Sequence, residues 1–167
     1  MRSLMQMTFF TIFLSSSLYA HSSSGIFEGW LSWFGYYHYI FVHFPIALII
    51  MACIAELFFI YKKEVQYNFV VNFLLIFALI FLIPTALSGL SLVESGTQEN
   101  SPLIGWHELF AFLTFSLNIA TLFIRNTTGL RTLYLWSLFF LLISVMGTAH
   151  FGGLMAFGDF NLFPPFF

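Results

Sequence analysis

The residues of this chain best suited to bind a metal ion or a cofactor are its histidines. A neutral imidazole nitrogen is a common ligand for iron, zinc and copper. The sequence contains five of them: His21, His38, His43, His107 and His150.

Other chemistry has little support in the sequence. Cys53 is the only cysteine, so the chain has no internal disulfide and no Cys-x-x-Cys or Cys-x-x-Cys-His motif. It contains no set of nucleophile, base and orienting residue, and no glycine-rich phosphate loop. A net charge of -2 argues against nucleic-acid binding, which needs a basic surface. We therefore expect a binding or electron-transfer subunit rather than a stand-alone enzyme.

The elements that must position the histidines are apolar helices. The 167 residues are 60% hydrophobic and only 7% charged, with a mean hydropathy of +0.93, whereas soluble domains are about 25% charged. Four stretches reach the length of about 20 residues that a membrane helix needs, namely 39–60, 68–92, 103–124 and 132–155. Their short connections make sequence neighbours antiparallel neighbours. We predict an all-α membrane protein, a four-helix up-down-up-down transmembrane bundle that forms one domain over residues 21–167.

The first 20 residues have the features of a secretory signal peptide. Arg2 precedes an apolar run at residues 7–14, which is too short to cross a bilayer, and small residues lead up to Ala20. We expect cleavage after Ala20. The alternative is an uncleaved anchor, which would give the same orientation.

The few charged residues predict the orientation, because Lys and Arg concentrate on the cytoplasmic side of a membrane protein. The first and third connections carry Lys62, Lys63, Arg125 and Arg131, whereas the other side carries Glu28, Glu94, Glu99 and Asp159 and no basic residue. We therefore expect a multi-pass protein of the bacterial inner membrane. Both ends of the mature chain would lie on the periplasmic side.

Two aromatic segments, residues 25–37 and 157–167, lie outside the predicted spans. Trp and Tyr favour the headgroup layer of a bilayer. We expect both segments to rest on the outer membrane surface as anchors. A docking surface for a partner is the alternative.

Three histidines are predicted to share one depth. Counted along the helices, His43, His107 and His150 are 18 or 19 residues from the basic residue at the cytoplasmic end of their span. At about 1.5 Å per residue, each lies roughly 27–29 Å from that end. His38 lies five residues further out than His43, at or above the interface.

Rows of small and polar residues, spaced by three and four, predict which face of a helix turns toward the bundle interior. His38 is about 140° round from His43 on a continuous helix, so the two cannot share a face. His150 lies off its row, so either the helix loosens at Gly152 and Gly153 or His150 is no interior ligand. The rows are His43, Ala47, Ile50 and Ile54; His107, Ala111, Thr114, Asn118 and Thr121; and Ser137, Leu141, Ser144, Thr148 and Gly152.

Three hypotheses follow for the histidines. Two diagonal helices of a bundle can each supply one axial ligand to a b-type haem. We expect such a haem with His43 and His107 as ligands, His150 in reserve and His38 as a further candidate. A zinc or copper ion bound by His43, His107 and His150 is the second hypothesis. A non-catalytic membrane anchor or assembly partner with interfacial histidines is the third.

Glu56, near the cytoplasmic end, is expected to pair with Lys62 or Lys63.

The run from His38 to Leu48, HYIFVHFPIAL, resembles the first span of an uncharacterised family of bacterial four-span membrane domains. That family has H-P-x-x-V-H-F-P-I-A-L at this point, with Tyr39 here in place of the proline. Residues 84–89 (PTALSG), His107 and the HFGG motif at His150 are also similar. The resemblance covers nearly the whole mature chain and implies the four-span fold. Some members of the family occur beside c-type cytochrome modules, which implies a c-type cytochrome or another redox protein as partner on the outer face. Assembly into a homo- or hetero-oligomer is compatible with the sequence.

Overall fold

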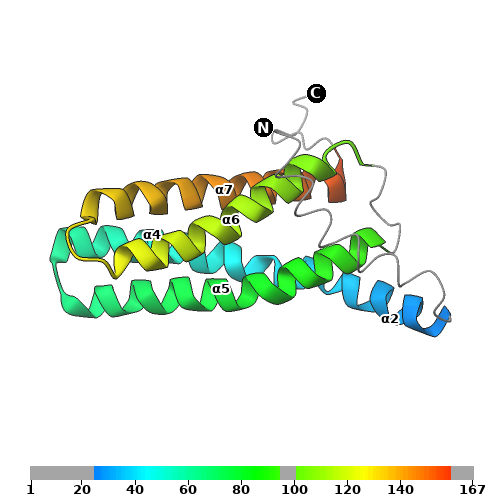
Figure 1. Ribbon diagram of the computed structural model, residues 1–167, viewed down its shortest axis with the longest axis horizontal. Helices are drawn as coiled ribbons and strands as arrows, with labels where there is room; N and C mark the ends of the chain where they lie inside the picture. The colour runs from blue at the N-terminus through cyan, green and yellow to red at the C-terminus, as the bar shows by residue number, and fades with distance from the viewer. Residues whose placement is uncertain (1–24, 95–100, 159–167) are drawn as a thin grey trace, which may run out of the picture.

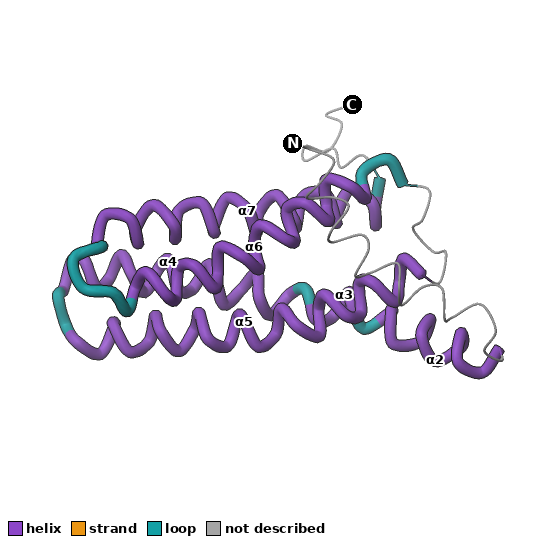
Figure 2. The backbone as a smooth tube through the Cα atoms, viewed as in Figure 1, coloured by secondary structure: helices purple, strands orange, loops and turns teal. Residues whose placement is uncertain are grey.

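The computed structural model describes residues 25–94 and 101–158, which are almost entirely helical (Figure 2). The predicted signal peptide, His21 and nearly all of the aromatic tail lie outside the described residues. The helices are α2 (Gly25–Tyr36), α3 (His38–Phe41), α4 (His43–Lys62), α5 (Val65–Glu94), α6 (Ile104–Arg125) and α7 (Arg131–Phe157).

Within this part of the chain, four helical stretches are long and apolar enough to cross a membrane. They are Gly29–Lys62, Val65–Val93, Ile104–Arg125 and Arg131–Phe157. Each contains nearly all of one predicted span, so the prediction of four helices long and apolar enough to cross a membrane is confirmed. Their outer surfaces are rich in exposed Leu, Ile and Phe, for example Phe123 at 74% exposed. A surface of this kind is stable in hydrocarbon but not in water.

The long helices form two antiparallel hairpins, α4–α5 and α6–α7, which lie side by side (Figure 1). Among the described residues, α4 also packs against α7 and α5 against α6, whereas the backbones of α4 and α6, and those of α5 and α7, do not pack against each other. Helices α4 and α6 are therefore diagonal partners. We call the end that carries Lys62, Arg125 and Arg131 the basic end, and the opposite end the histidine end.

A proline accounts for the break between α3 and α4. Pro45 has no N–H to donate to the carbonyl of Phe41, and proline is accommodated best in the first turn of a helix, where its N–H would have no partner. The hydrogen bond on the C-terminal side of the break, from Ile46 N–H to Val42 O, is long at 3.4 Å. A new helix, α4, therefore begins at His43, and His38 belongs to the short helix α3 that precedes it.

Helix α5 continues through Pro84, and hydroxyl groups satisfy carbonyls around it. Thr85 Oγ1 donates to Phe81 O at 2.7 Å, and Ser88 Oγ donates to Pro84 O at 2.7 Å. Hydroxyls that bond to their own helix are a usual way to accommodate proline in a membrane helix. Thr85 and Ser88 are both buried and face the bundle interior.

The predicted interior rows are confirmed in α6 and α7 and wrong in α4. Thr114, Asn118 and Thr121 are buried, as are Ser137, Leu141 and Ser144. In α4, by contrast, the row of His43, Ala47, Ile50 and Ile54 is exposed, and the interior is formed by Pro45, Ile49, Ala52 and Glu56. Small size was a poor guide there, because lipid accepts alanine as readily as leucine or isoleucine.

An ionic cluster fills the bundle interior at the basic end. The Glu56 carboxylate, only 2% exposed, accepts from Arg125 Nη1 at 2.7 Å, from Tyr134 O–H at 2.7 Å and from Arg131. The expected pairing of Glu56 with Lys62 or Lys63 is therefore wrong. Both lysines are exposed, whereas Glu56 faces inward and meets guanidinium groups, which suit buried carboxylates because of their planar set of donors.

Two asparagines extend this cluster to α5. Arg125 Nε donates to Asn72 Oδ1 at 2.8 Å, and Arg125 Nη2 donates to both the carbonyl and the side chain of Asn68. The cluster thus joins all four long helices. Because Arg125 is 4% exposed, removal of its carboxylate partner would leave a buried charge unpaired.

The replacement Glu56→Gln is expected to lower the free energy of unfolding by about 3–5 kcal/mol, since a buried arginine loses its counter-charge. The measurement is reversible unfolding of the detergent-solubilised protein in SDS, followed by circular dichroism. Glu64→Gln is the matched control, because Glu64 is exposed and bonds only locally to Gln66. Equal stability of the two variants would contradict the proposed importance of the cluster.

Candidate functional site

The structure brings together two histidines from diagonal elements at the histidine end, His38 of α3 and His107 of α6. Their ring centroids are 6.2 Å apart and the ring planes lie at 85°. Both side chains are half-buried. The earlier expectation that His38 lies above the layer of the other histidines is wrong. It took Lys62 of α4 as level with Arg125 of α6, whereas the residue that meets Arg125 is Glu56. Glu56 is 18 residues from His38, as Arg125 is from His107.

Each of these rings is held by a backbone carbonyl of a neighbouring long helix. His38 Nδ1 bonds to Thr85 O of α5 at 2.8 Å, and His107 Nδ1 bonds to Thr148 O of α7 at 3.0 Å. A carbonyl oxygen only accepts, so Nδ1 must carry the proton in both rings. Nε2 is then the nitrogen available for a ligand. This is the arrangement found around metal-binding histidines, where an outer hydrogen bond fixes the tautomer and the ring orientation.

Two glycines make room for the rings. A Cβ atom on Gly89 would stand 2.9 Å from His38 Cε1, and one on Gly152 would stand 3.0 Å from His107 Cε1. Both distances are shorter than a normal carbon–carbon contact. Any larger residue at either position would displace the ring beside it. The positions of these glycines are therefore matched to the two histidines.

The other predicted ligands lie outside this pair. His43 and His150 are exposed on the lipid-facing surface, and the ring of His150 contacts Phe151 at a centroid distance of 5.5 Å. Glu108, next to His107, is also exposed. In the part of the chain that the structure describes, no three His, Cys, Asp or Glu residues gather in a way that could hold a metal ion.

Sequence reasoning missed the pairing of His38 with His107, although two signals for it were present. Pro45 lies seven residues after His38 and interrupts the helix between them, at Val42. Gly89 and Gly152 mark places in α5 and α7 where a bulky group from another helix can approach. Neither signal identifies the partner by itself, because the contact depends on how the two hairpins pack.

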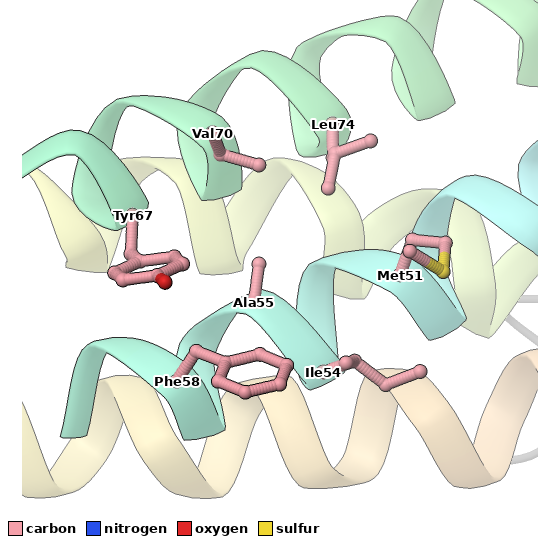
Figure 3. Close-up of a pocket in the computed structure, with 7 residues that line it drawn as sticks. All are labelled: Met51, Ile54, Ala55, Phe58, Tyr67, Val70 and Leu74. Atoms are coloured by element: carbon pink, nitrogen blue, oxygen red, sulfur yellow. The ribbon is translucent and has the colours of Figure 1, made fainter. Parts of the chain in front are cut away.

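An apolar groove of about 210 Å³ lies between α4 and α5, toward the basic end, and no His, Cys, Asp or Glu lines it (Figure 3). Such a groove suits an acyl chain or the side of a neighbouring helix. It is lined by Met51, Ile54, Ala55, Phe58, Tyr67, Val70 and Leu74.

Comparison with known proteins agrees with the fold. Neither the curated proteins nor the solved structures contain a match to the chain. A family model described as "Predicted membrane protein (DUF2231)" matches residues 37–159, which include the histidine pair, both carbonyls that hold it and the ionic cluster. The resemblance found in the sequence is thereby confirmed, and the chain belongs to the DUF2231 family of predicted membrane proteins.

Proposed function

We propose that this protein binds a b-type haem between His38 and His107 and serves electron transfer in a bacterial inner membrane. The observation that carries the proposal is the pair itself. Two half-buried imidazoles from diagonal elements approach each other, each with Nδ1 bonded to a carbonyl. Ionisable groups within membrane helices are costly and usually functional.

The spacing of the two rings suits ligands on opposite sides of one metal ion. At metal–nitrogen distances of about 2.0–2.1 Å, two opposed imidazoles place their centroids about 6.3 Å apart, whereas two ligands of a tetrahedral ion place them about 5.2 Å apart. The separation of His38 and His107 is 6.2 Å. The distance between the two rings therefore matches that of two opposed ligands more closely than that of two ligands in a tetrahedral site.

The number of ligands also favours haem over a bare ion. Zinc sites in proteins use three or four protein ligands, and the described residues offer a group of two at this place. A haem needs only two ligands from the protein, because the macrocycle supplies the other four nitrogens. When bound, it supplies one-electron transfer between Fe(II) and Fe(III). The zinc or copper site proposed for His43, His107 and His150 would need two exposed side chains to turn inward.

The proposed orientation places the basic end in the cytoplasm, since Lys62, Arg125 and Arg131 gather there. The histidine pair then lies near the outer face. Helix α2 extends past the bundle at that end, and its exposed Trp30 and Trp33 suit the headgroup layer. A c-type cytochrome or another redox protein on the outer side is the partner that this position favours.

An absorption spectrum of the detergent-purified protein after haem-replete expression tests the proposal. We expect a Soret band that shifts on reduction, and its loss in His38→Ala and in His107→Ala. His43→Ala and His150→Ala are matched controls that should keep the band, because both side chains point to lipid. A stoichiometric metal without a chromophore would favour the metal-binding hypothesis. Absence of both would favour a membrane anchor.

The two close glycines generate a further prediction. Gly89→Ala and Gly152→Ala should each weaken haem binding by about tenfold, as changes beside a metal ligand commonly do. Haem affinity is measured by titration of the apoprotein. Gly153→Ala is the control, because a Cβ atom there meets nothing within 4 Å. Equal affinities for the Gly152 and Gly153 variants would place the ligand elsewhere.

A further inference from the structure

A series of polar side chains follows the seam between α6 and α7 below His107. Thr114 Oγ1 is 2.9 Å from Ser144 Oγ and 3.2 Å from Thr148 Oγ1, and the backbone carbonyl of Thr148 holds His107. At the basic end, Arg125 contacts Tyr134 and Glu56. The first group lies on α6 and α7, and the second adds Glu56 of α4 to Arg125 of α6 and Tyr134 of α7.

The space between the two groups contains the only buried side-chain atoms of the described residues that lack a hydrogen-bond partner. They are both amide atoms of Asn118 and the hydroxyl of Thr121, and each of these residues is 0% exposed. An unpaired polar group in an apolar interior costs several kcal/mol. Water is the polar molecule small enough to meet these atoms in a packed helix seam.

The unpaired atoms lie where the series is interrupted. Thr114, Asn118, Thr121 and Arg125 follow one face of α6 at steps of four, three and four residues. Thr114 and Arg125 are 11 residues apart, or about 16 Å along the helix. Asn118 and Thr121 divide that distance into steps of about 4.5–6 Å, which one water molecule bridges between side-chain oxygens.

We propose that water molecules bound at Asn118 and Thr121 join the hydroxyl groups of Thr114, Ser144 and Thr148 to the Glu56–Arg125 cluster, and that this column carries protons through the bundle. Each hydroxyl or water accepts a proton from one neighbour and releases one to the next, so that no group is changed by a passage. Arg131, whose side chain is 45% exposed, brings the cluster into contact with water at the basic end. At the other end the column ends at the hydroxyl of Thr148, which is half-buried, and protons exchange with water there. The column does not depend on a bound haem.

Proton flux into proteoliposomes tests the proposal. The full chain is reconstituted with pyranine inside the vesicles, and valinomycin with a potassium gradient sets an inside-negative potential. We expect vesicles with the wild-type protein to acidify faster than protein-free vesicles. Asn118→Leu and Thr121→Val should reduce the rate to that of protein-free vesicles, because an apolar side chain removes the groups that hold the water.

Two further variants separate loss of the column from loss of folding. Thr121→Ser keeps the hydroxyl and should keep the flux, whereas Thr121→Val has nearly the same shape without it. Ser116→Ala removes a half-buried hydroxyl on another face of α6 and should have no effect. If Asn118→Leu does not elute from size-exclusion chromatography as a folded protein, the comparison of proton flux between Thr121→Val and Thr121→Ser decides the test. Wild-type flux no greater than that of protein-free vesicles would overturn the proposal, as would equal flux in Thr121→Val and Thr121→Ser.

Discussion

Hydrocarbon offers no hydrogen bonds, so each polar side chain within a span must find its partner inside the protein. This constraint decides the arrangement of the bundle more than apolar packing does, because lipid tails are as apolar as leucine and give helices little reason to associate. Glu56, Asn118 and Tyr134 are accordingly buried, while Phe123 and many other large apolar side chains face outward. The interior is where polar groups meet, and the bundle holds together around them.

The polar contacts join the two hairpins near both of their ends. At the basic end, Glu56 of the first hairpin binds Arg125 and Arg131 of the second. At the histidine end, the ring of His38 from the first faces the ring of His107 from the second. Between them the interior contains apolar side chains such as Leu75 and Leu141, both fully buried, beside the polar row of α6. A ligand between the histidines would therefore connect the hairpins at the end that the ionic cluster does not reach.

Some of this arrangement was predictable from single helices and some was not. The interior row of α6 was correct because Thr114, Asn118 and Thr121 are polar and can have no other place in a membrane. The row of α4 was wrong because nearly every residue of that helix is apolar and suits either lipid or core. The pairing of His38, and that of Glu56 with arginine rather than lysine, depend on which helices meet. No periodicity within one helix contains that information.

Thr148 connects the proposed ligand site to the proposed column. Its backbone carbonyl holds His107 Nδ1, and its hydroxyl lies 3.2 Å from Thr114 Oγ1. A hydrogen bond to Nδ1 makes the other nitrogen of an imidazole a stronger ligand. The position of α7 at Thr148 therefore affects both the ligand site at His107 and the column at Thr114. The two contacts are nevertheless chemically separable. The carbonyl belongs to the backbone and remains when the side chain is changed, whereas the hydroxyl is removed by a substitution that leaves the helix intact. The ligand strength of His107 therefore depends on the position of the α7 backbone, whereas the last step of the column, from Thr114 to Thr148, depends on the Thr148 hydroxyl.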